Sequence, residues 1–296
     1  MSLLNKNETY NEKANQRLFK LLSIYLNLAP DYIDKDMINE ITYGDSGGEE
    51  FAFANLAASA CGLDIYENEN DKKFFRTHFL PCFKKLDIAP YLEDLYYNKV
   101  VFPKEVSSEW SFETRICKPY EAFVFDDPKV LQDGRILPRV GFFDTEYAYP
   151  AVLENGREWM TLMPNETNTT KQAIASARGK VLTYGLGLGY FTYMASIKSN
   201  VSSVTVVERS SKVIELFKTY ILPQFPDSSK IEIIEADAFD FAENRMSDGR
   251  YDSVFVDIWH DPSDGCELYL RMKQYEHLLP NAEFVYWVED TLKLYI

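Results

Sequence analysis

Three glycines at alternate positions form the segment best suited to bind a ligand through its backbone. They are Gly185, Gly187 and Gly189, and they follow an apolar run at 180–184. Glycine lets a chain turn tightly, and the helix that follows presents free N–H groups. Glu208 ends the next apolar run, 19 positions after Gly189, where a carboxylate can accept from both hydroxyls of a ribose. The pair predicts a nucleoside site; the alternative is a glycine-rich turn beside a surface glutamate.

The spacing of these glycines argues against a dinucleotide ligand. A G-x-G-x-x-G fingerprint that starts at Gly185 requires a small residue at position 190, which is Tyr190. One that starts at Gly187 would end at Thr192. A G-x-G-x-G loop therefore favours a nucleoside ligand that has no pyrophosphate.

The elements around these residues alternate regularly from residue 167 onward. The expected strands are 180–184, 203–208, 230–235, 251–257 and 283–287, and the expected helices are 169–178, 190–199, 211–221, 238–245 and 267–277. Alternating strands and helices predict βαβ units and a parallel sheet, and the continuous apolar strands indicate burial on both faces. Ligands of such sheets bind beyond the carboxyl ends of the strands, where the glycines and Glu208 fall.

The first half of the chain has a different pattern. Helical spacing is found at 15–28, 49–61 and 71–86, and Pro81 should break the last of these helices. Short β-prone runs follow at 122–125, 140–144, 147–153 and 158–163, with a hairpin signal at Asn155-Gly156. We therefore predict a helical subdomain at 1–99, a small β-rich subdomain at 100–164 and a Rossmann-like domain at 165–296.

The motifs of the last domain resemble the class I S-adenosylmethionine-dependent methyltransferase superfamily. The matching segments are 181–189, 206–208, 235–238 and 251–257. The resemblance implies a Rossmann-like, doubly wound, mostly parallel α/β sheet and S-adenosylmethionine as the cofactor. The cofactor-binding residues that it implies are Gly185, Leu186, Gly187 and Gly189 beside the methionine part, Glu208 with Arg209 at the ribose, Asp237 and Ala238 at the adenine, and Asp257 and Glu166.

Thr183 departs from the family pattern, which often has an acid there that contacts the methionine amino group. Glu166 or Asp257 would have to take that role. The segment 159–167 can fold over the cofactor in this superfamily. Within it, Asn165 or Thr167 is expected to cap the following helix.

A narrower resemblance is to the spermidine synthase branch. Those proteins also have a small β-rich subdomain before the sheet, and they follow strand four with D-x-x-D-P. Here the loop runs from Asp257 through His260 to Asp261-Pro262 and is one residue longer. Only nine residues follow Trp287, too few for the helix and two strands that complete the family's seven-stranded sheet. Either strands from 100–165 complete the sheet, or the sheet is shortened.

Asp257 and His260 are the candidate catalytic residues. His260 is a candidate base, because histidine is the side chain best suited to proton transfer at neutral pH, while Asp257 is placed to orient an amine. The alternative is a polar loop in which Asp261-Pro262 makes a turn and His260 is merely exposed. The predicted function is a methyltransferase that acts on a small molecule. The alternatives are an aminopropyltransferase similar to spermidine synthase and a non-catalytic S-adenosylmethionine-binding protein.

Composition limits the partners and the compartment. Lys and Arg total 31 and Asp and Glu total 46, a net charge of −15, and no basic run is present, so nucleic acid and anionic membranes are not expected partners. The four cysteines form no CxxC pair, and with three histidines no metal site is predicted. Without a leader or an apolar run of about 20 residues, we expect a cytoplasmic protein. The sequence does not determine the oligomeric state.

Overall fold

The structure is a computed structural model that describes residues 3–42, 48–103, 106–107 and 109–296. The chain divides into two compact units. Met1–Ala89 and Arg115–Tyr149 form the first unit, and Pro90–Thr114 and Pro150–Ile296 form the second. The segment 100–164 therefore contributes to both units. None of the described helices is long and apolar enough to cross a bilayer.

The second unit contains a five-stranded parallel sheet in the order β11–β10–β7–β8–β9. The strands are β7 (Gly179–Tyr184), β8 (Val201–Glu208), β9 (Ile231–Glu235), β10 (Ser253–Val256) and β11 (Glu283–Tyr286). All four neighbouring pairs run parallel. The chain starts in the middle of the sheet, builds one half through β9 and then crosses back to build the other half. This is the predicted doubly wound arrangement, and its switch point lies between β7 and β10.

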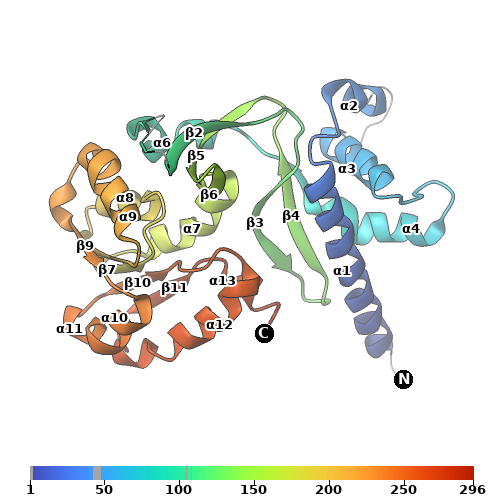
Figure 1. The fold of residues 1–296 in the computed structure, drawn as a ribbon. Helices are drawn as coiled ribbons and strands as arrows, with labels where there is room; N and C mark the ends of the chain where they lie inside the picture. The colour runs from blue at the N-terminus through green and yellow to red at the C-terminus, as the bar shows by residue number, and fades with distance from the viewer. Residues whose placement is uncertain (1–2, 43–47, 104–105, 108) are drawn as a thin grey trace. The chain divides into compact units, whose positions relative to one another are not determined.

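Helices cover both faces of this sheet, with α8 and α9 on one side and α10, α11 and α12 on the other (Figure 1). The helical segments of this unit are α5 (Ala89–Leu92), α6 (Leu95–Lys99), α7 (Pro164–Ser176), α8 (Tyr190–Ser196), α9 (Ser211–Leu216), η3 (Phe217–Ile221), η4 (Leu222–Gln224), η5 (Ser228–Lys230), α10 (Ala238–Asn244), α11 (Met246–Gly249), α12 (Pro262–Lys273), η6 (Glu276–Leu278) and α13 (Glu289–Leu292). Their apolar sides share one core with the buried strands, including Val181, Val206 and Val254.

Helix α7 begins earlier than predicted. Met163 is its N-cap and makes no capping hydrogen bond through its side chain, and Pro164 occupies the first turn. Asn165 and Thr167 lie inside the helix, so the prediction that either one caps it is wrong. Proline is favoured at this first position because the missing N–H has no helical partner there.

The strands between 100 and 165 build sheets of their own. β2 (Trp110–Cys117), β5 (Tyr147–Glu154) and β6 (Arg157–Thr161) form one sheet in the order β2–β5–β6. The predicted Asn155-Gly156 turn joins β5 to β6, with both residues at positive φ. None of these strands joins the five-stranded sheet within the described residues.

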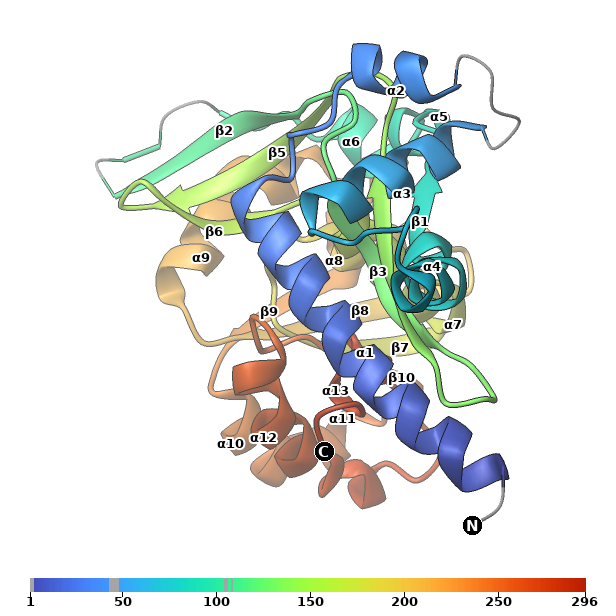
Figure 2. The ribbon, with the colours of Figure 1, turned by 90° about the vertical axis from the view of Figure 1, so that its right-hand side faces the viewer.

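The first unit combines helices with a three-stranded sheet in the order β1–β4–β3. Its elements are α1 (Leu3–Leu28), α2 (Lys35–Thr42), α3 (Gly48–Ala60), α4 (Glu69–Phe74), η1 (Phe75–Phe79), η2 (Leu80–Cys82), β1 (Phe83–Lys85), β3 (Phe123–Val130) and β4 (Ile136–Phe142). Figure 2 shows α1 in full length, and it packs against β4 and η1. The predicted helix at 71–86 is wrong beyond Pro81, because the chain there becomes β1 and pairs with β4.

Candidate functional site

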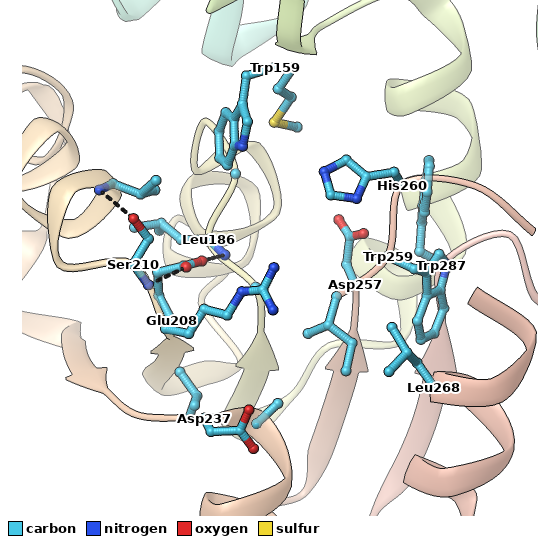
Figure 3. A pocket seen from close by; sticks show the side chains of 18 of the residues that line it. Trp159, Leu186, Glu208, Ser210, Asp237, Asp257, Trp259, His260, Leu268 and Trp287 are labelled. Atoms are coloured by element: carbon cyan, nitrogen blue, oxygen red, sulfur yellow. Dashed lines mark hydrogen bonds between the residues drawn. The ribbon is translucent and has the colours of Figure 1, made fainter. Parts of the chain in front are cut away.

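A cavity of about 620 Å³ lies at the carboxyl ends of the strands in the second unit (Figure 3). Residues that directly follow β7, β8, β9, β10 and β11 all border it. These are Gly185, Arg209, Ala236, Asp257 and Trp287. The volume falls within the usual range for small-molecule sites. The cavity therefore lies where the doubly wound fold is expected to bind its ligand.

The glycine loop needs two of its glycines for different reasons. A Cβ on Gly185, at φ +91°, would lie 1.9 Å from the carbonyl oxygen of Asp257, so the loop and the end of β10 touch through their backbones. A Cβ on Gly187, at φ +51°, would lie 2.7 Å from the sulfur of Met160. The backbone N–H of Leu188 points at the same sulfur at 3.2 Å. Gly185 is therefore fixed by backbone packing, whereas Gly187 faces a movable side chain that lines the cavity.

Gly189 has a different place from the one expected. It is the N-cap of α8, its absent side chain makes room for Phe217, and it does not border the cavity. Hydrogen bonds to α6 and its N-cap also hold the glycine loop and the start of α8 in place, and no sequence pattern predicted this helix. The hydroxyl of Tyr96 donates to the carbonyl oxygen of Leu188, and Tyr190 donates to Asp94 at 2.9 Å.

Glu208 points into the cavity with both carboxylate oxygens already oriented. One oxygen accepts from the backbone N–H of Leu186 at 3.1 Å, and the other accepts from the N–H of Ser210 at 2.8 Å (Figure 3). An ionised carboxylate has about four acceptor positions, so capacity for further donors remains. The predicted ribose contact requires such a held carboxylate, and it stays a prediction.

Arg209, Asp237 and Ala238 also border the cavity. One oxygen of Asp237 accepts from the backbone N–H groups of Phe239 at 2.8 Å and Asp240 at 3.1 Å, which makes Asp237 the N-cap of α10. The predicted adenine contact therefore comes from a side chain that the following helix holds in place.

Asp257 and Glu166 are neighbouring carboxylates that both line the cavity. Burial raises the pKa of Glu166 to about 8, and the charge of Asp257 adds to that shift. Burial likewise raises the pKa of Asp257 to about 7, with a further contribution from Glu208. Neither one forms an ion pair with any residue that the structure describes. Thr183, which stands where the family often has an acid, is buried beneath the loop.

His260 also borders the cavity, but its side chain is 68% exposed. Its ring Nδ1 lies 3.3 Å from Asp264, and its backbone N–H donates to the same carboxylate at 3.1 Å. Asp261 and Asp264 form the capping box of α12. Of the acids in this loop, Asp257 alone lines the cavity, and no group of His, Cys, Asp and Glu suited to a metal ion occurs in the described ranges.

The cavity has walls for which the sequence analysis named no role. Trp110 and Met160 border it from β2 and β6, Trp259 and Trp287 border it from the segments that follow β10 and β11, and Leu268 borders it from α12. The available signal was the position of Trp259 just after one predicted strand and of Trp287 at the end of another. Trp110 joins the site only through tertiary packing, which a local sequence pattern does not predict.

No protein-family profile and no curated protein matches this chain. Among solved structures, a candidate S-adenosylmethionine-dependent methyltransferase from Streptococcus mutans is 18% identical over 43% of this chain and 36% of that chain, with a TM-score of 0.33. A candidate O-methyltransferase from Klebsiella pneumoniae is 14% identical over 36% of this chain and 48% of that chain (TM-score 0.29). A spermidine synthase with a transition-state analogue is 15% identical over 48% of this chain and 52% of that chain (TM-score 0.33).

The matched part of this chain thus spans between about a third and a half of those proteins. The class of the fold follows from the sheet itself. A five-stranded parallel sheet in this order, with a glycine loop after its central strand, gives the second unit a Rossmann-like, doubly wound α/β fold.

Proposed function

We propose that this chain is an S-adenosylmethionine-dependent methyltransferase that acts on a small molecule. The observation that carries the proposal is the arrangement of Glu208. Its carboxylate ends the second strand of the sheet, is held by the glycine loop through Leu186, and faces a cavity of suitable size. A nucleoside with a free ribose diol is the ligand that such a carboxylate recognises.

The residues that line the cavity fit this cofactor chemically. Glu208 has free acceptor capacity for two hydroxyls, Asp237 and Ala238 flank the position proposed for adenine, and Glu166 offers a carboxyl group to the methionine ammonium group. S-adenosylmethionine supplies an electrophilic methyl group on a positively charged sulfur. Unpaired carboxylates in a sheltered cavity favour a positively charged ligand.

Asp257 is the residue that we assign to the acceptor. It directly follows β10, and Figure 3 shows its carboxylate on the side of the cavity away from Glu208 and Asp237. A carboxyl group with a pKa of about 7 exchanges protons near neutrality. Asp257 is therefore suited to orient an acceptor and to take up its proton, while exposed His260 has a lesser role.

A second candidate function is aminopropyl transfer from decarboxylated S-adenosylmethionine. The observation that favours it is the acidity of the lining, in which six carboxylates face one arginine, Arg209. The loop after Asp257, one residue longer than the spermidine synthase pattern, argues against it. A third possibility is a protein that binds the nucleoside without catalysis.

Calorimetric titration of the full chain with S-adenosylmethionine, its decarboxylated form and S-adenosylhomocysteine tests the proposal. We expect S-adenosylmethionine to bind more tightly than its decarboxylated form, and NADH to bind more weakly than S-adenosylhomocysteine. Preference for the decarboxylated form would instead support aminopropyl transfer. Tighter binding of NADH would overturn the cofactor assignment.

A further inference from the structure

All four tryptophans of the chain line the one cavity described above. Trp110 lies on β2 and Trp159 on β6, while Trp259 and Trp287 follow β10 and β11. In Figure 3, Trp159 stands at one side of the cavity and Trp259, Trp287 and Leu268 stand at the other, with Asp257 and His260 between them in this view. Among the aromatic side chains, tryptophan has the largest apolar face and attracts a cation most strongly to its ring.

The surrounding structure holds these rings in place. The indole N–H of Trp287 donates to the hydroxyl of Thr169 at 2.9 Å. The rings of Trp110 and Trp159 meet edge to face, with their centroids 5.6 Å apart. Gly265 lets α12 approach Trp259 closely, since a Cβ there would lie 3.0 Å from two ring atoms. Rings that are fixed before a ligand arrives cost less to order when it binds.

The carboxyl groups beside these rings have no cationic partner among the described residues, so a bound cation would stabilise their charged form. Glu166 and Asp257 are close enough for the charge of one to act on the other, and the described residues place no cation against either. The single arginine in the lining, Arg209, is exposed beside Glu208. A carboxylate kept from water gains most from a cationic partner, and aromatic faces around it favour a cation that has an apolar body.

Building on the function proposed above, we propose that the acceptor is a monoamine with an apolar body, bound as its ammonium ion between the tryptophan faces and the carboxylate of Asp257. Asp257 takes one proton from the ammonium group, and the freed nitrogen bonds to the methyl carbon as the bond from that carbon to sulfur breaks and S-adenosylhomocysteine leaves. Ile258 and Leu268 extend the apolar wall on the Trp259 side. Two further acids of the lining, Glu154 and Glu158, belong to the β5–β6 hairpin, where Glu158 is exposed. A long polyamine would require a second sheltered acidic group; Glu208, Asp237 and Glu166 are already assigned to the nucleoside cofactor, which leaves only the two hairpin glutamates among the described lining residues.

Calorimetry of the full chain at neutral pH, with and without saturating S-adenosylhomocysteine, tests this assignment. The probes are 2-phenylethylamine, its uncharged isostere 2-phenylethanol, and 1,4-diaminobutane. We expect the monoamine to bind at least about tenfold more tightly than the alcohol and more tightly than the diamine. Asp257→Asn should reduce the preference for amine over alcohol, and Trp287→Leu should weaken binding of both aromatic probes.

Glu267→Gln is the matched control, because Glu267 is exposed on α12 and does not border the cavity. It should keep the preference for the amine. Equal binding of amine and alcohol would overturn the assignment of a cation, and tighter binding of the diamine would overturn the monoamine. The S-adenosylhomocysteine titration tests nucleoside binding, and therefore the proposed function, separately from amine binding. If that nucleoside does not bind while the amine still does, the nucleoside proposal fails and the amine site stands.

Discussion

The carboxylate of Glu208 accepts a hydrogen bond from the backbone N–H of Leu186, so the end of β8 is tied to the loop that follows β7. The other oxygen of the same carboxylate accepts from Ser210, which begins the next turn of chain. One side chain thus fixes the shape of the glycine loop and presents a negative charge to the cavity. A substitution at Glu208 therefore acts both on the ligand and on the loop.

Glu208→Ala should weaken S-adenosylhomocysteine binding by about tenfold or more, because a hydrogen bond to a charged group contributes about 1.5–3 kcal/mol. Calorimetry measures this change. Glu208→Gln keeps an acceptor for one backbone N–H, so its affinity for S-adenosylhomocysteine should lie between those of the wild type and Glu208→Ala. Glu235→Gln, an exposed acid that ends neighbouring β9, is the control and should bind normally. Unchanged affinity in a folded Glu208→Ala protein would remove Glu208 from the site.

Gly185→Ala and Gly187→Ala should separate folding from binding. At Gly185 the new Cβ meets a backbone oxygen, so we expect a loss of more than about 2 kcal/mol of stability. At Gly187 it meets the flexible end of Met160, and the positive φ costs about 1–2 kcal/mol. Gly187→Ala should therefore stay folded and lose affinity for S-adenosylhomocysteine, and Gly187→Val should abolish binding. Thermal melts and calorimetry test both; normal binding by the folded Gly187 variants would make the loop an ordinary turn.

The raised pKa values of Glu166 and Asp257 predict how stability changes with pH. Between about pH 5 and pH 8 the folded protein retains protons on these groups that the unfolded chain has released. Their contribution therefore makes the folded state less stable as the pH rises through this window. The melting temperature of the ligand-free protein should fall more steeply with pH than that of Asp257→Asn. Glu267→Gln should follow the wild type, and equal slopes for Asp257→Asn and wild type would contradict the prediction.

Asp257→Asn should reduce turnover by about 10²–10⁴, the usual range for a positioned acid–base group, while S-adenosylhomocysteine affinity stays within a few-fold. The substitution keeps the size of the side chain and removes its charge. Single-turnover kinetics with the amine found by titration measure the loss. If the variant instead loses the cofactor, Asp257 substitutes for the acid that is missing at Thr183 and belongs to the methionine part of the site.

His260→Ala should have a smaller effect than Asp257→Asn, because the ring is mostly exposed and is already held by Asp264. We expect a loss of turnover below about tenfold that varies with pH, and no change in nucleoside affinity. His277→Ala, an exposed histidine away from the cavity, is the control. A loss as large as that of Asp257→Asn would make His260 the principal base.

The sequence predicted the second unit well because its signals are local. Each strand of the five-stranded sheet contains a short apolar stretch, and the glycines and Glu208 mark the ends of two of them. The start of β1 after Pro81 escaped prediction because that short strand exists only through its pairing with β4. The cap of α7 was misassigned because Pro164 begins the helix before the polar residues that usually signal a start.

The candidate site was predictable around Glu208, Asp237 and Asp257, and not around Trp110 and Met160. Glu208, Asp237 and Asp257 each end or follow a strand, and the topology of a parallel sheet brings such positions together. Trp110, by contrast, reaches the cavity from a separate sheet, and Met160, on β6 of that sheet, packs beside Gly187. These contacts depend on how that hairpin packs, which residue spacing does not encode.

The placement of the tryptophans makes the two units spectroscopically distinct. Every tryptophan belongs to the second unit, and the first unit contains none. Indole emission therefore reports only on the second unit, whereas far-ultraviolet circular dichroism reports on both through their backbones. Denaturant titrations followed by the two signals coincide if the units unfold together and separate if the first unit opens alone. The native tryptophans thus allow cooperativity of unfolding between the two units to be measured without an added label.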